Sequence, residues 1–167
     1  SGSAAQHVAE MSDELELEYL IGDALTTLQK YLKSRQINVH VHNANGTMLP
    51  VMGVKDLLLN ALGEIIRNAA QYSHEGGEVD IVLRQRDERA VVEVVDHGIG
   101  ISEQDQAEIW NVMTQSDRDR NEQQGVGMGL PIARGLIEAH GGEIALSSVE
   151  GEGTQVTVSL PLATVED

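Results

Sequence analysis

Two pairs of strand-forming segments, each pair joined by a few turn-forming residues, constrain the fold of this chain most strongly. They are residues 79–83 with 91–95, joined through 87–89, and residues 143–148 with 154–160, joined through 150–153. Strands with so short a connection pair antiparallel, because a parallel pair needs a crossover of about a dozen residues. The sequence therefore predicts two β-hairpins.

Helical periodicity fills most of the remaining chain. Apolar residues recur at helical spacing over 12–36, 55–73 and 130–140, and a further helix is expected over 102–113. Residues 37–42 alternate as a half-buried strand, and Asn45-Gly46 is expected to turn the chain into a second strand over 47–52. This order predicts an α+β fold, a two-layer α/β sandwich whose mixed sheet carries helices on one face.

Length and charge limit the possible partners. The 167 residues suit one domain, which we expect over 13–163, after a cloning remnant and the end of a linker or dimerisation helix (1–12) and before a tail (164–167). A net charge of −16 repels phosphate backbones and anionic membranes, which argues against nucleic acid or direct membrane contact. With no Cys and no membrane-length apolar run, the chain is expected to be cytoplasmic.

A polar stripe follows the helix expected over 55–73. Glu64, Asn68 and then Gln71 or Tyr72 are spaced to share one edge of that helix, beside its apolar stripe. Functionally, Asn68 would offer its carbonyl oxygen to Mg²⁺ and Glu64 would act as a general base or orient a nucleophile. The stripe alone is also compatible with a solvated helix flank.

Three glycine motifs could complete a site around this stripe. Asp96-His97-Gly98-Ile99-Gly100 follows a Val-rich strand, where a buried carboxylate could accept a hydrogen bond from an exocyclic amine such as adenine N6. Gly125-x-Gly127-x-Gly129 precedes a helix, as in a phosphate cradle. Thr154 follows Gly151-Glu152-Gly153. The first and third motifs are also consistent with simple turns.

The order and placement of these motifs resemble the catalytic ATP-binding domain of two-component sensor histidine kinases, which has the Bergerat fold of the GHKL family. The resemblance covers about Glu14 to Pro161. The segment EIIRNAAQY resembles the N box of the family. The three glycine boxes are resembled, in order, by DHGIGI, GVGMGLPIA and GEGTQVTVSLP. It implies Mg²⁺ and ATP as cofactors. It also implies that the γ-phosphoryl group is transferred to a histidine on a separate dimerisation domain. A cognate response regulator would be a further partner.

The resemblance also assigns residue roles. Glu64 would be the catalytic carboxylate and Asn68 the metal ligand. The nucleotide would be bound by Asn68, Gln71, Tyr72, Asp96, Gly98, Gly100, Ile101, Gly125, Gly127, Met128, Gly129, Leu130 and Thr154. The parent protein could be a membrane-bound sensor of which this is a cytoplasmic part.

Three departures leave alternatives open. Gln71 stands where the family usually has Lys or Arg, for which Arg67, Arg118, Arg120 or Arg134 could substitute. The Phe-rich box is replaced by IWNVMTQSDRDR, and no HELRTP-like phosphoacceptor box is present. A nucleotide-binding regulatory module or pseudokinase without phosphotransfer is therefore the main alternative, and a GHKL ATPase or anti-sigma-type serine kinase is a third.

Overall fold

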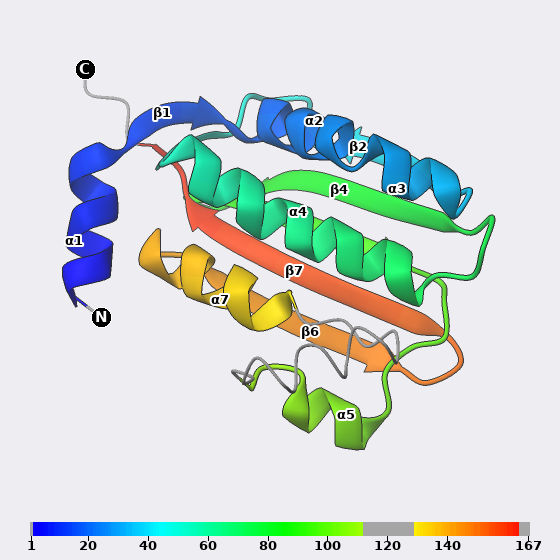
Figure 1. Cartoon of the computed structure of the whole chain (residues 1–167). Helices are drawn as coiled ribbons and strands as arrows, with labels where there is room; N and C mark the ends of the chain where they lie inside the picture. The colour runs from blue at the N-terminus through cyan, green and yellow to red at the C-terminus, as the bar shows by residue number, and fades with distance from the viewer. Residues whose placement is uncertain (1, 112–128, 164–167) are drawn as a thin grey trace.

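A five-stranded mixed sheet forms the centre of the molecule (Figure 1). The computed structural model describes residues 2–111 and 129–163. The strands, in the order β2-β4-β5-β7-β6 across the sheet, are β2 (Asn38–Asn43), β4 (Glu78–Arg86), β5 (Arg89–Asp96), β7 (Gly153–Pro161) and β6 (Glu143–Val149). The two predicted hairpins, β4–β5 and β6–β7, are both confirmed.

Helices cover one face of this sheet, which confirms the two-layer α+β prediction (Figure 1). They are α2 (Leu17–Thr27), α3 (Gln29–Ser34), α4 (Lys55–Tyr72) and α7 (Leu130–Ala139). The short α5 (Glu103–Glu108) lies at one end, and α1 (Gly2–Met11) at the other, against α7 and β3 (Pro50–Gly53). No helix in the described ranges is long and apolar enough to cross a bilayer.

Strand register divides the sheet into an apolar and a polar face. Ile81 pairs with Val94, which pairs with Val156, and all three are buried beneath the helices. Complete burial of such a side chain contributes about 1.5–3 kcal/mol. On the opposite face Arg84 and Glu93 form an ion pair at 3.3 Å. The period-two alternation of the sequence therefore corresponds to two different environments.

Helix α4 positions most of the candidate site. Its predicted apolar stripe, Leu58, Leu62, Ile65 and Ala69, is buried against the core. Glu64 and Asn68 lie on the edge of this stripe, where α4 neighbours α7. Because the apolar side chains fix the rotation of α4 about its axis, they also fix the direction in which the polar stripe points.

The single helix predicted over 12–36 is wrong in two places. Strand β1 (Asp13–Glu16) pairs antiparallel with β3, and α2 begins at Leu17 after it. The helix then breaks at Leu28, next to two threonines, Thr26 and Thr27, whose hydroxyls bond to carbonyls four residues earlier. Such back-bonding tends to bend helices.

The hairpin predicted from 37–42 and 47–52 is also wrong. Gly46 does turn the chain, with φ of +65°. However, β3 pairs with β1 in a separate two-stranded sheet, whereas β2 pairs in parallel with β4, beyond α4. The parallel register places Val39 beside Val79 on the helix-covered face. Burial of these apolar residues, rather than proximity in sequence, selects the partner of β2.

A buried histidine joins the C-terminal end of α7 to the start of α4. His140 Nε2 accepts the Val54 N–H at 3.1 Å, so Nδ1 carries the proton and donates to the Leu136 carbonyl at 2.8 Å. Gly53 leaves room for the ring, since a Cβ there would lie 2.9 Å from His140 Cδ2. His140 thus connects the two helices that carry the candidate site.

Candidate functional site

Three buried polar side chains define the candidate site. They are unusual because they lie among the apolar residues between the helices and the sheet. Asn68, Asp96 and Thr154 are only 3%, 3% and 4% exposed. Neither Asn68 Oδ1 nor Asn68 Nδ2 has a hydrogen-bond partner among the described residues. A buried amide without partners is costly, typically by about 1–3 kcal/mol. Asn68 therefore suits a ligand-binding role, and its carbonyl oxygen is of the donor type that Mg²⁺ prefers.

Asp96 ends β5 on the same buried face. Burial raises the pKa of its carboxyl above the ordinary value, while hydrogen bonds from the backbone N–H groups of Gly98 and Thr154, and the nearby His97, lower it. The Gly98 N–H lies 3.0 Å from Asp96 Oδ1. This carboxylate is held in place by the backbone, and when ionised it can only accept further hydrogen bonds.

Close packing explains the glycines that follow Asp96. A Cβ at Gly98 would overlap the Tyr72 carbonyl, 2.7 Å from its carbon, where the Ile99 N–H donates to Tyr72 O at 3.1 Å. Gly100 has φ of +69° and lies against the backbone of Val149. The loop is thus pressed between the end of α4 and the end of β6, and only glycine fits both contacts without displacement.

Thr154 completes a polar row across three strands, together with a residue that sequence reasoning missed. Asp96 pairs with Thr154 in the register of β5 and β7, and Thr154 pairs with Ser148 in that of β7 and β6. The hydroxyls of Ser148 and Thr154 lie 2.7 Å apart, and Ser148 Oγ also accepts the Ile101 N–H at 2.8 Å. The sequence did contain a signal for Ser148. It occupies the next inward-facing position of β6 after Ile144 and Leu146, where another apolar residue would be expected.

Glu64 lies opposite the start of α7. A Cβ at Gly129, the N-cap of α7, would overlap the Glu64 carboxylate and stand 2.9 Å from Glu64 Cβ. Leu130 follows, fully buried. Of the predicted phosphate cradle, the structure brings Gly129 and Leu130 to the site, whereas Gly125, Gly127 and Met128 lie outside the described residues.

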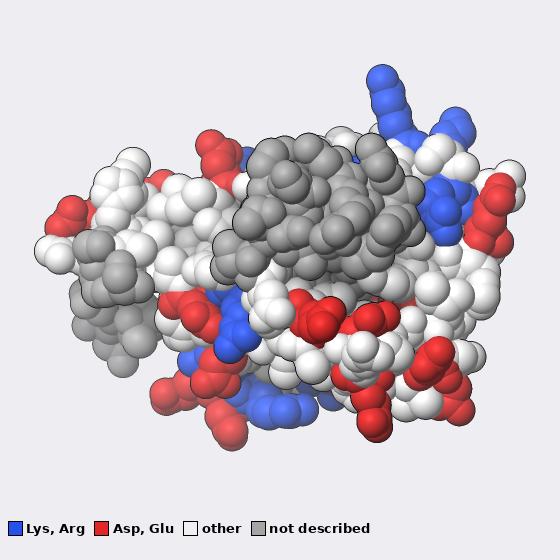
Figure 2. Space-filling view, turned by 60° about the horizontal axis from the view of Figure 1, so that its bottom comes forward, with Lys and Arg blue, Asp and Glu red and all other residues white. Residues whose placement is uncertain are grey.

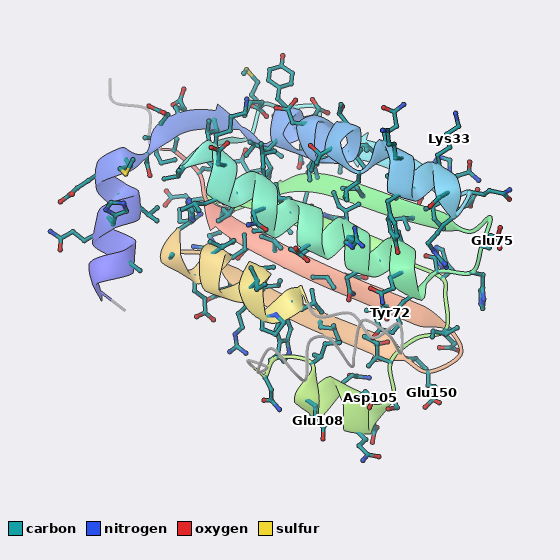
Figure 3. The ribbon with its side chains drawn as sticks, viewed as in Figure 1. Lys33, Tyr72, Glu75, Asp105, Glu108 and Glu150 are labelled. Carbon is teal, nitrogen blue, oxygen red and sulfur yellow. The ribbon has the colours of Figure 1, made fainter. Side chains whose placement is uncertain are left out.

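The remaining α4 candidates, Gln71 and Tyr72, are half-buried at its C-terminal end. Figure 3 shows Tyr72 at this end of the molecule, the end that also carries Glu150 in the β6–β7 turn and Asp105 and Glu108 of α5. Three elements, α4, the β6–β7 turn and α5, therefore meet at this end of the molecule.

Two of the cations that could substitute for a Lys or Arg at position 71 have other contacts. The Arg67 guanidinium lies 4.5 Å from the ring centroid of Tyr31. Arg134 lies 5.3 Å from that of Trp110 and also pairs with Glu138 at 2.9 Å. Arg118 and Arg120 lie outside the described residues.

The chain has more acidic than basic residues, 27 against 11. Acidic side chains, with a few basic ones among them, lie across the face shown in Figure 2, below the region drawn in grey. Within the described residues, no group of three His, Cys, Asp or Glu could hold a metal ion.

Comparison with known proteins identifies relatives over most of the chain. Residues 53–164 match the family described as histidine kinase-, DNA gyrase B-, and HSP90-like ATPase. The sensor histidine kinase WalK of Bacillus subtilis is 38% identical over 110 residues, which are 64% of this chain and 18% of WalK. The sensor protein kinase PmrB of Pseudomonas aeruginosa is 34% identical over 147 residues, 87% of this chain and 30% of PmrB. The chain thus spans less than a third of either relative.

Solved structures share the fold. The catalytic domain of histidine kinase ThkA superimposes with a TM-score of 0.76 at 23% identity, covering 90% of this chain and 95% of that one. ThkA in complex with the response regulator protein TrrA gives 0.73 at 20% identity, over 91% of this chain and 42% of that chain. These similarities confirm the resemblance to histidine kinase catalytic domains at the level of fold.

Proposed function

Because this chain belongs to the histidine kinase-, DNA gyrase B-, and HSP90-like ATPase family, we propose that it binds Mg²⁺ and ATP between α4, the loop after β5 and the start of α7. It would donate the γ-phosphoryl group to a histidine on a separate dimerisation domain, from which a response regulator receives it. The observation that carries this proposal is Asn68, a buried amide without hydrogen-bond partners among the described residues, one helical turn from Glu64.

Different residues would bind the base, the metal ion and the phosphates. Asp96 would accept a hydrogen bond from the amino group of adenine, while the Gly98–Gly100 loop shapes the base pocket beside Tyr72. Asn68 would hold Mg²⁺, which when bound neutralises phosphate charge. Ile101, Gly129, Leu130 and Thr154 would support the base and phosphate ends of the site.

Transfer itself requires positioning more than covalent chemistry by this domain. The bond between the γ-phosphorus and its bridging oxygen breaks, ADP leaves, and a phosphorus–nitrogen bond forms with the acceptor imidazole. Glu64 would orient that ring through its other N–H or accept the proton released. Glu64 lies beside Gly129, the last glycine of the predicted phosphate cradle, which supports a role for its carboxylate near the phosphates.

The test combines the chain with a separate phosphoacceptor domain and ATP labelled at the γ-position. We expect label on the acceptor histidine, dependent on Mg²⁺ and reduced by Glu64→Gln with little change in nucleotide affinity. The regulatory-module alternative is favoured by Gln71 and by the engagement of Arg67 and Arg134 elsewhere. Saturable nucleotide binding without any label on histidine would establish that alternative and refute the kinase proposal.

The third alternative, an ATPase or a serine kinase, would give a different product. An ATPase of this family would release phosphate steadily without an acceptor, and a serine kinase would label Ser on a partner. Either result would replace histidine as the phosphoryl acceptor while leaving the nucleotide site intact.

A further inference from the structure

Three polar side chains form a row across the helix-covered face of the sheet, where neighbouring positions are Val, Leu and Ile. They are Asp96 of β5, Thr154 of β7 and Ser148 of β6, each directly opposite the next in the strand register. Directly opposite residues have Cβ atoms about 4.5–5.5 Å apart. The register therefore places the three side chains next to one another.

The hydroxyl of Ser148 takes part in three hydrogen bonds. It accepts the Ile101 N–H at 2.8 Å, donates to the Gly153 carbonyl at 3.0 Å, and lies 2.7 Å from Thr154 Oγ1. A hydroxyl has one proton and two lone pairs. All three bonds can exist together only when Thr154 donates to Ser148, because the single Ser148 proton is already used.

The backbone on both sides of the Ser148 hydroxyl is held in place by α5. Gln106 Nε2 donates to the Ile101 carbonyl at 2.6 Å and to the Ser148 carbonyl at 3.1 Å. This side chain ties the glycine loop to β6, so the Ile101 N–H stays directed at Ser148. The bond from Thr154 to Ser148 is thus a consequence of the surrounding backbone.

Once its proton is committed, Thr154 has only lone pairs left for a ligand. Its neighbour Asp96, when ionised, also only accepts. The two residues together then favour a base that presents hydrogen-bond donors, and disfavour one that presents a carbonyl oxygen at the same position. We propose that Ser148 is a specificity-determining residue: by fixing Thr154 as an acceptor, it makes the pocket select a 6-aminopurine over a 6-oxopurine. This inference rests on the proposed nucleotide site.

Ser148→Ala tests this directly. Without the Ser148 hydroxyl, Thr154 can rotate and donate, which removes the penalty for a 6-oxo group. Calorimetric titration of the full chain with ADP and with inosine diphosphate, which carries a 6-oxo group in place of the 6-amino group, gives the selectivity. We expect ADP-over-inosine selectivity to fall about tenfold, the effect of one buried hydrogen bond.

Two matched variants serve as controls, and a third provides a second test. Ser147→Ala, on the exposed face of the same strand, should leave selectivity unchanged, and Ser148→Thr, which restores a hydroxyl, should preserve it. Thr154→Val removes the lone pairs while keeping the shape, and decides the question if Ser148→Ala does not fold: its selectivity should fall as well.

Two outcomes would overturn the inference, and they are distinguishable. An unchanged ADP-over-inosine ratio in a Ser148→Ala protein that still binds ADP, or in Thr154→Val, would refute the role of Ser148 alone. Failure of the wild-type chain to bind either nucleotide would refute the proposed function, and this inference with it.

Discussion

Gly129 lies directly against the carboxylate of Glu64, so closely that any side chain at 129 would overlap it. Gly129 caps α7, and Glu64 lies in the middle of α4. The absence of a side chain at one position therefore allows the charged group at the other to occupy the start of α7.

Gly129→Ala should impair phosphotransfer more than nucleotide binding. The new methyl group would overlap Glu64 from its Cβ to its carboxylate, so the carboxylate must move and the start of α7 must shift slightly away from α4. We expect the transfer rate to an acceptor domain to fall about tenfold or more, since a 1 Å misplacement can cost up to about 100-fold. Gly135→Ala, at an exposed position of α7 with open space, is the control. Equal transfer rates in the two variants would contradict the assigned role of Glu64.

Asn68→Leu should separate metal dependence from stability. The substitution removes a buried amide without hydrogen-bond partners among the described residues, so the free energy of unfolding without ligand should rise, by about 1 kcal/mol. The enhancement of ATP affinity by Mg²⁺ should disappear, while affinity measured with a chelator stays unchanged. Denaturant unfolding measures the change in stability, and calorimetry measures the effect of Mg²⁺ on ATP affinity. A Mg²⁺ effect that persists in the variant would remove Asn68 as a ligand.

Asp96 should make stability depend on pH. Because burial raises the pKa of its carboxyl, the folded protein holds that proton more tightly than the unfolded chain. The stabilisation is fully present below about pH 4 and is lost as pH rises through the raised pKa. Asp96→Asn has no such proton, so wild type should lose stability relative to the variant as pH rises through this window. Urea unfolding of both proteins across the window checks this, and parallel curves would argue against it.

His140→Ala should destabilise the fold without involving the base pocket. The variant leaves the Val54 N–H without its acceptor and opens a cavity beside Gly53, which together should cost about 2–4 kcal/mol. His42→Ala, on exposed β2, should change the free energy of unfolding by less than about 0.5 kcal/mol. Thermal unfolding distinguishes them, and similar midpoints would show that the His140 bridge contributes little.

The sequence was informative wherever neighbouring residues decide the structure. The β4–β5 and β6–β7 hairpins and helices α4 and α7 follow from local periodicity and turn residues, and all four were predicted. The first helix was predicted too long, because periodicity alone did not reveal that residues 13–16 pair with β3. The hairpin of β2 with β3 was wrong because a half-buried strand shows which of its faces is apolar but not which strand will lie beside it.

The same division holds for the candidate site. By itself, the sequence indicated the candidate residues and their order, since Glu64, Asn68 and Asp96 follow from helical spacing and strand ends. Only the tertiary structure placed Ser148 beside Thr154, set Gly129 against Glu64 and left Asn68 buried without partners among the described residues. These relationships join residues far apart in the chain or on different strands, and they depend on register and packing. Local sequence patterns fix the periodicity of one element, whereas contacts between elements are set by which arrangement buries the most apolar surface.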